Sequence, residues 1–118
     1  MMTQAGRAVR AEVVWRRIDR PGQESFRLLE GPAGHLLEGG VSVFDREGVA
    51  SYRYRIWCDS GWRTRSAVIE GWRGALEFSA VVESSPAGRW TVNGVHEPAF
   101  DGAVDLDLGF TPSTNLLP

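Results

Sequence analysis

The chain has 118 residues and a net charge of −2, with 42% hydrophobic and 24% charged residues. This composition is typical of a single globular domain and excludes a chain that is disordered throughout. The low net charge provides no positive field for a polyanion, so we expect no nucleic-acid partner.

Short apolar segments separated by turn residues recur along the chain, which is the pattern of an antiparallel meander. In the first half, strands are expected at residues 9–18, 25–30, 35–46 and 49–58. Gly and Pro mark turns between them. Gly39 and Gly40 lie inside the third strand and predict a bulge or a sharp coil, because a strongly curved sheet needs residues without a Cβ there.

The best-defined hairpin joins strands at residues 52–58 and 62–69 through a three-residue loop that ends on Gly61. Such a loop fits a type I turn followed by a left-handed glycine. In the resulting register, Arg55 lies opposite Arg65. One face then carries a mainly aromatic and apolar set: Tyr52, Tyr54, Ile56, Trp62, Thr64, Val68 and Trp72. The opposite face carries Arg53, Arg55, Trp57, Arg63 and Arg65.

Further strands are expected at residues 75–84, 89–93 and 104–110, and no window joins helical periodicity to a helix cap. The sequence therefore predicts an all-β fold, with an antiparallel, strongly curved meander sheet that forms part of a β-roll or open barrel. We expect one domain over residues 1–118. Residues 1–8 are expected to be disordered, and residues 111–118 to be a truncated connection to a missing C-terminal part.

Four segments carry a family resemblance. The run Asp-Leu-Asp-Leu-Gly-Phe-Thr-Pro-Ser-Thr-Asn-Leu-Leu-Pro at 105–118 resembles the hallmark of a bacterial family of glycolipid-binding proteins. Upstream, the segments Trp-Arg-Arg-Ile-Asp at 15–19, Cys-Asp-Ser-Gly-Trp-Arg-Thr-Arg-Ser at 58–66 and Gly-Arg-Trp-Thr-Val-Asn-Gly at 88–94 resemble it in the same order. The resemblance implies a β-roll or open barrel akin to bacterial lipoprotein carriers, and a lipid or glycolipid ligand. It implies no catalytic residues. Members of the family continue beyond the Leu-Leu-Pro.

The arginine face of the predicted hairpin is the main candidate for ligand binding. Like charges directly opposite each other destabilise a strand pair, and a bound anion between Arg55 and Arg65 would remove that penalty. Trp57 on the same face offers a ring for stacking on a sugar. The proposed headgroup site comprises Arg53, Arg55, Trp57, Arg63 and Arg65. The alternative is a solvated face whose charges pair with acidic residues on neighbouring strands: Asp45, Glu47, Glu77 and Glu83.

The aromatic side chains of the opposite face are candidates for an apolar concavity that holds acyl chains. Ligand sites in open barrels lie in their mouths and are mostly apolar. The expected lining residues are Trp15, Tyr52, Tyr54, Trp62 and Trp72. The alternative is that these residues form an ordinary core, since aromatic side chains dominate core packing.

The function that follows is non-enzymatic binding of a lipid or glycolipid, with no cofactor and no metal site. One alternative is an interaction domain that assembles, for example as a homodimer, through an open sheet edge. A second is a carbohydrate-acting enzyme that uses Asp101, Asp105 and Asp107 together with His35 or His96. The first ten residues lack the apolar segment of a signal peptide, and no apolar run approaches the length of a membrane span, so a cytoplasmic location is expected.

Overall fold

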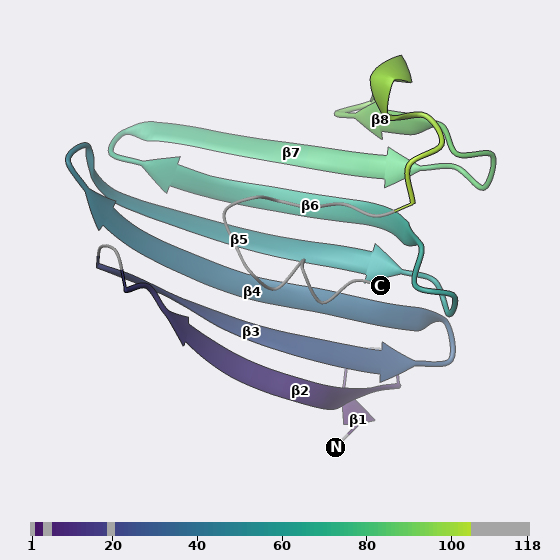
Figure 1. The fold of residues 1–118 in the computed structure, drawn as a ribbon, viewed down its shortest axis with the longest axis horizontal. Coiled ribbons are helices and arrows are strands. Elements are labelled where there is room, and N and C mark those ends of the chain that lie inside the picture. The colour runs from purple at the N-terminus through teal and green to yellow at the C-terminus, as the bar shows by residue number, and fades with distance from the viewer. Residues whose placement is uncertain (1, 4–5, 19–20, 105–118) are drawn as a thin grey trace.

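The computed structural model describes residues 2–3, 6–18 and 21–104 as one antiparallel sheet in which every strand pairs with its neighbour in sequence (Figure 1). The strands are β1 (Met2–Thr3), β2 (Arg7–Arg16), β3 (Gly22–Gly31), β4 (Gly34–Asp45), β5 (Gly48–Cys58), β6 (Thr64–Arg73), β7 (Leu76–Ser84), β8 (Trp90–Val92) and β9 (Val95–His96). A 3-10 turn, η1 (Pro98–Phe100), follows. No α-helix occurs in these ranges. The predicted all-β meander is therefore confirmed.

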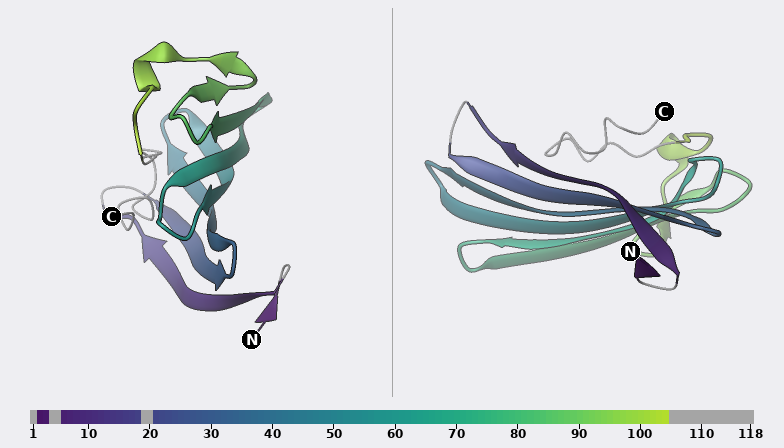
Figure 2. Two further views of the ribbon diagram at one scale, coloured as in Figure 1. Left: turned by 90° about the vertical axis from the view of Figure 1, so that its right-hand side faces the viewer. Right: turned by 90° about the horizontal axis from the view of Figure 1, so that it is seen from below.

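The sheet is strongly curved and open. Figure 2 shows it bending in one direction along its strands and across them, with β2 and β8 far apart. Trp90 donates its indole N–H to the carbonyl oxygen of Ala103 at 3.1 Å. Because residues 98–104 lie on the side toward which the sheet bends (Figure 2), the face that carries the Trp90 ring is the concave one.

The main core lies on this concave face. Alternation along each strand brings together an apolar set that is almost fully buried: Phe26, Leu37, Val41, Val43, Ala50, Tyr54, Ile56, Cys58, Ala67, Val82 and Trp90. Burial of this set provides the main driving force for folding. The residues that alternate with it on the same strands, including Arg53, Arg55 and Trp57, point to the convex face.

Gly39 and Gly40 do not form the predicted bulge, because pairing with β3 and with β5 runs through both residues without a shift. Tyr54 lies opposite Gly39 and extends across it to donate a hydrogen bond to the buried carboxylate of Glu24 on β3. A Cβ on Gly39 would lie 2.5 Å from the Tyr54 hydroxyl oxygen. Gly39 is therefore needed for aromatic packing on the concave face.

The predicted register between β5 and β6 is wrong. The loop spans Asp59 to Arg63, and its left-handed residue is Trp62, with φ of 68°, instead of Gly61. Cys58 pairs with Thr64, but its neighbour Trp57 pairs with Ser66, so Arg65 is an extra residue in a bulge. The extra residue reverses the alternation along β6. Val68 and Trp72 therefore share the convex face with Arg53 and Arg55, against the prediction.

Element ends differ modestly from expectation. β2 begins at Arg7, and β1 pairs with it through Thr3 and Arg7, within the segment expected to be disordered. A tight turn at Asn93 and Gly94 joins β8 to β9, with positive φ at both residues (50° and 83°), as is typical of an Asn-Gly hairpin turn. The expected strand at 104–110 and the connection at 111–118 lie outside the described residues, apart from Val104, which is not in a strand. The division into one domain stays a prediction.

Candidate functional site

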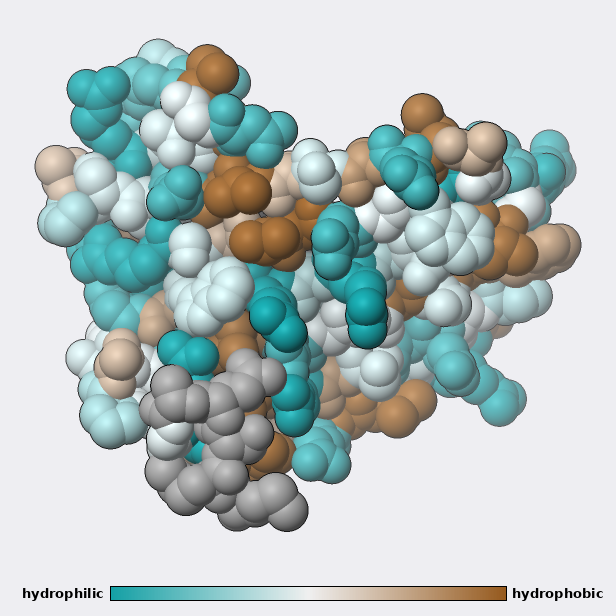
Figure 3. All heavy atoms as spheres, turned by 180° about the vertical axis from the view of Figure 1, so that it is seen from behind, coloured by the Kyte–Doolittle hydropathy of each residue, from teal (hydrophilic) through white to brown (hydrophobic). Residues whose placement is uncertain are grey.

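An open pocket of about 900 Å³ lies over β2 to β6. By strand alternation, most of its lining residues point to the convex face: Glu12, Val14, Ser25, Arg27, Glu38, Gly40, Arg53, Arg55, Trp57, Val68 and Glu70. Ser25 and Gly40 are cross-strand partners without bulky side chains, so they form the floor. Figure 3 shows this face, with hydrophilic side chains standing over the middle of the sheet.

Glu38 is the centre of the charge network in the pocket. Its Oε1 accepts a hydrogen bond from Arg27 Nε, and its Oε2 accepts one from Arg55 Nε at 3.1 Å. The Glu38 side chain is 14% exposed, whereas that of Arg55 is 55% exposed. Two guanidinium groups therefore share one largely buried carboxylate, and each keeps donors directed elsewhere.

Arg53 is the cation of the pocket that pairs with no acid among the residues described here. It lies opposite Gly40 on one side and Glu70 on the other, yet forms no ion pair with Glu70. With Arg27, Arg55, Glu12, Glu38 and Glu70, the pocket holds as many carboxylates as guanidinium groups. Such a surface presents many hydrogen-bond donors and acceptors but little net charge.

Trp57 provides the aromatic side chain of the pocket. It is half-buried, and it lies on the convex face between Leu36 of β4 and Ser66 of β6. An indole in this setting is an apolar surface beside charged groups, which suits the C–H face of a sugar ring. Three of the five predicted headgroup residues, Arg53, Arg55 and Trp57, thus line one pocket.

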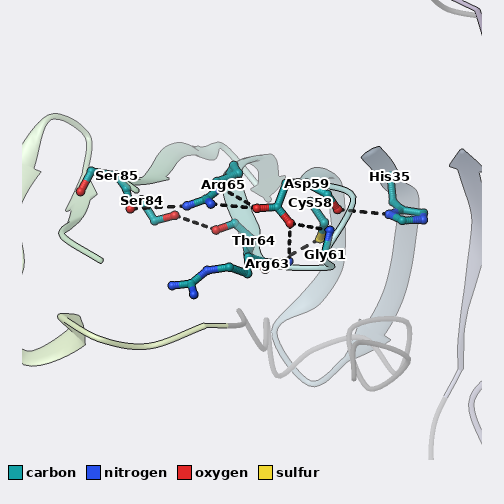
Figure 4. Close-up of polar contacts among 9 residues, drawn as sticks. All are labelled: His35, Cys58, Asp59, Gly61, Arg63, Thr64, Arg65, Ser84 and Ser85. Carbon is teal, nitrogen blue, oxygen red and sulfur yellow. Dashed lines mark hydrogen bonds and ion pairs between the residues drawn. The ribbon is translucent and has the colours of Figure 1, made fainter. Parts of the chain in front are cut away.

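The other two predicted residues lie elsewhere. Asp59 organises the β5–β6 loop: its Oδ1 accepts the backbone N–H groups of Gly61 (2.9 Å) and Arg63 (3.0 Å). Its Oδ2 contacts the guanidinium of Arg65, at 3.0 Å from Nε and 2.8 Å from Nη2 (Figure 4). Arg65 therefore holds the loop, and the exposed Arg63 side chain points away from Asp59 in Figure 4. The Arg63 backbone N–H, then the Arg65 guanidinium, keeps the pKa of Asp59 below its usual value.

The predicted like-charge pair does not exist, because Arg55 lies opposite Val68 and not opposite Arg65. Of the acidic residues expected to neutralise the arginine face, Asp45 contacts Arg73 at 2.8 Å and Glu47 contacts it at 4.0 Å. Hydrogen bonds with Asp45, and then with Tyr52, raise the pKa of Arg73. Glu77 and Glu83 form no ion pair with any residue that the structure describes.

Sequence reasoning missed Arg27 and Glu38. A two-residue turn at Pro32 and Ala33 pairs Gly31 with Gly34, and counting back from it places Arg27 opposite Glu38. That turn length was therefore the available signal. The opposite charges at these two positions agree with it.

Comparison with known proteins supports the predicted family. Residues 12–118 match the family described as "Putative glycolipid-binding". The chain belongs to this family. It is also similar to a protein of the DUF1089 family from Pseudomonas aeruginosa whose crystal structure is known, with 27% sequence identity and a TM-score of 0.70. The match covers 88% of this chain but 55% of that one, so the family member described here spans about half of its solved relative. A search of curated proteins found no match.

The aromatic residues expected to line an acyl-chain cavity are mostly engaged in packing. The Trp62 ring stacks on His35, with centroids 3.6 Å apart. Tyr52 packs against Phe78, and Tyr54 is buried over Gly39. Trp72 lies on the convex face and is 42% exposed. Trp15, Tyr52, Trp62 and Trp72 do not line the charged pocket.

Of the three acidic residues proposed for catalysis, the structure describes Asp101. His96 Nε2 lies 2.9 Å from Asp101 Oδ2, and Asp101 Oδ1 also accepts the backbone N–H of Trp90 at 3.3 Å. The His96 contact is the main cause of the lowered pKa of Asp101. Asp105 and Asp107 lie outside the described residues. Within the described ranges no three potential metal ligands cluster, and no helix there is long and apolar enough to cross a membrane.

Proposed function

We propose that this protein binds a glycolipid without changing it chemically, and that the sugar headgroup occupies the convex-face pocket. The observation that carries the proposal is that one open pocket presents both Arg53, which pairs with no described acid, and the half-buried indole of Trp57, four residues further along β5. Arg53 donates to ring or hydroxyl oxygens, and Trp57 packs against the sugar's C–H face. The family description agrees with this class of ligand.

The charge balance of the pocket favours a polyol over a phosphate. A sugar hydroxyl both donates and accepts, so it uses the carboxylates of Glu12 and Glu70 as well as the guanidinium of Arg53. A phosphate accepts only, and it would meet Glu12, Glu38 and Glu70 as like charges. Glu38 already accepts a hydrogen bond from the guanidinium group of Arg27 and from that of Arg55. We therefore favour the sugar over the anionic headgroup, both of which the sequence left open.

The acyl chains need apolar contacts near the headgroup. Tyr54 and Trp62 are packed against protein atoms on the concave face and offer little free surface. Val14 and Val68, by contrast, are apolar residues of the charged pocket itself, and Val14 is 69% exposed. We therefore place the first methylene groups of the lipid against Val68, which lies opposite Arg55, because three strands separate Val14 on β2 from Val68 on β6.

The test is binding of a soluble alkyl glucoside below its micelle concentration, measured by titration calorimetry. A charge-assisted hydrogen bond contributes about 1.5–3 kcal/mol, so Arg53→Gln should weaken binding about tenfold or more. Trp57→Ala should weaken it to a similar degree. Arg63→Gln is the matched control, because it removes an exposed arginine that does not line the pocket. Equal affinities for wild type, Arg53→Gln and Trp57→Ala would refute the pocket.

A second candidate is assembly through the edge of β7. β8 pairs with β7 at Val82, Glu83 and Ser84, and the backbone of Val81 hydrogen-bonds with Asn93, so in the described sheet residues 76–80 of β7 have a partner on one side only. Leu76 and Phe78 on that part are exposed. A strand of a second copy could pair there. Sedimentation as a monomer at high protein concentration would count against it.

The enzyme alternative has no comparable support. Asp101 is already engaged with His96 and with the Trp90 backbone, and the other two acids of that alternative, Asp105 and Asp107, lie outside the described residues. Cytoplasmic location likewise stays a prediction from the sequence.

A further inference from the structure

Exposed hydrophobic side chains gather at one end of the sheet. This end, on the left in Figure 1, is where the β2–β3, β4–β5 and β6–β7 connections lie. Ile18 in the β2–β3 connection is fully exposed, at 103%, and Leu76 at the start of β7 is 70% exposed. Further exposed members near this end are Val14, Phe44, Val49, Trp72 and Phe78. A monomer rarely leaves so many large apolar groups together in water without a reason.

The apolar side chains surround this end instead of covering one face. Phe44 and Val49 are cross-strand partners on the convex face. Leu76 and Phe78 alternate to the concave face, in line with the core residue Val82. Ile18 extends from the connection itself. A folded protein partner covers one face of such an end, whereas a lipid layer encloses it from all sides.

Arginine residues accompany these apolar groups. A groove of about 650 Å³ between the β2–β3 and β4–β5 connections is lined by Arg16 and Arg17 together with Ile18, Phe44 and Val49. Arg46, in the β4–β5 turn, is exposed as well. The nearby carboxylates of Asp45 and Glu47 both lie within ion-pair distance of Arg73. The groove therefore offers cations and apolar surface side by side, which is complementary to an anionic headgroup and the acyl chain below it.

We propose that this hairpin end docks on an anionic membrane, with Ile18 and Phe44 entering the interface and Arg16 and Arg46 contacting lipid phosphates. Peripheral proteins bind membranes through this combination of inserted apolar side chains and flanking cations. Membrane docking does not depend on sugar binding in the convex-face pocket, but the two are compatible. Gly40 of the pocket floor and Ser42 of the groove lie two residues apart on β4, so a docked protein holds its pocket close to the lipid surface.

The experiment is co-sedimentation of the full chain with vesicles of phosphatidylcholine, and of phosphatidylcholine mixed with phosphatidylglycerol, neither containing glycolipid. The expected result is strong binding to the mixed vesicles and weak binding to phosphatidylcholine alone. The double variant Ile18→Ser/Phe44→Ser should bind at least tenfold more weakly, because it loses two inserted hydrophobic groups. Arg16→Gln and Arg46→Gln should each lose about fivefold.

The matched control is Val95→Ser/Phe100→Ser, which also removes two exposed apolar side chains (63% and 51% exposed), here at the opposite end of the sheet (Figure 1). This variant should bind like wild type. Circular dichroism checks that each variant is folded. If Ile18→Ser/Phe44→Ser does not fold, Arg16→Gln and Arg46→Gln still test the proposal. No binding by wild type, or equal loss in both double variants, would overturn the proposal. So would binding that the Ile18→Ser/Phe44→Ser variant retains, or self-association through this end without any vesicle binding.

Discussion

Tyr54 lies directly across Gly39, its cross-strand partner, and its hydroxyl reaches past that glycine to the next strand. Gly40, one position further along β4, points to the opposite face and forms part of the pocket floor. Two consecutive glycines thus serve two faces of one sheet. The first admits a core aromatic ring on the concave side, and the second leaves room for a ligand on the convex side.

The two glycines should respond differently to the same substitution. In Gly39→Ala the new Cβ would lie 2.5 Å from the Tyr54 oxygen and 2.7 Å from the backbone oxygen of Ser25. Overpacking of this kind lowers the free energy of unfolding by about 1–3 kcal/mol. In Gly40→Ala the nearest atom is the Tyr52 carbonyl oxygen at 3.8 Å, so stability should change by about 0.5 kcal/mol or less while sugar binding weakens. Urea denaturation measures the difference, and equal destabilisation of both variants would contradict the packing.

Tyr54→Phe tests the polar contact within the core. The variant keeps the ring over Gly39 but removes the hydroxyl that donates to the buried Glu24 carboxylate. Loss of a hydrogen bond to a buried charged group should lower the free energy of unfolding by about 1–3 kcal/mol. A double-mutant cycle with Glu24→Gln isolates the pairwise contribution. A coupling energy near zero would show that the two side chains contribute independently.

The meander and the sidedness of most strands are local properties, which is why the sequence predicts them. Alternation and turn residues place Tyr54 and Ile56 on one face and Arg53 and Arg55 on the other without knowledge of any long-range contact. The role of Gly39 was not predictable in the same way. It depends on a tyrosine from another strand, and a glycine within a strand signals a bulge as readily as a close approach.

The predicted β5–β6 register is wrong for a specific reason. The preference of glycine for positive φ predicts that Gly61 takes the left-handed position. Instead, Asp59 accepts two backbone N–H groups and closes a longer loop, in which Trp62 is the left-handed residue. The stacking of Trp62 on His35 accompanies this conformation. A side-chain acceptor and a ring contact from β4 together outweigh the intrinsic preference. The resulting bulge moved Arg65 out of the predicted site.

Glu38→Gln should change the ligand preference of the pocket. Glu38 is the carboxylate shared by Arg27 and Arg55, so its neutralisation leaves two guanidinium groups with unmatched charge. Affinity for inorganic phosphate or for a short-chain phosphatidic acid should rise, by roughly tenfold if one strong charge-assisted contact forms. Affinity for the alkyl glucoside should change much less. Calorimetric titration of both ligands checks this, with Glu83→Gln, which neutralises an exposed carboxylate outside the pocket, as the control.

The carboxylate of Asp59 should make the β5–β6 loop sensitive to acid. Its pKa in the folded protein lies below the usual 3.8, chiefly because the Arg63 N–H and then Arg65 stabilise the charged form. A lowered folded-state pKa contributes stability that is present above the unfolded-state pKa and is lost as the pH falls through the folded-state value. Asp59→Asn retains an oxygen acceptor for the backbone but removes the charge. Its Tm should therefore lie below that of wild type at neutral pH, and the difference should shrink below about pH 4. Thermal unfolding at a series of pH values measures it. Two curves that stay parallel through this range would show that the negative charge of Asp59 does not stabilise the loop.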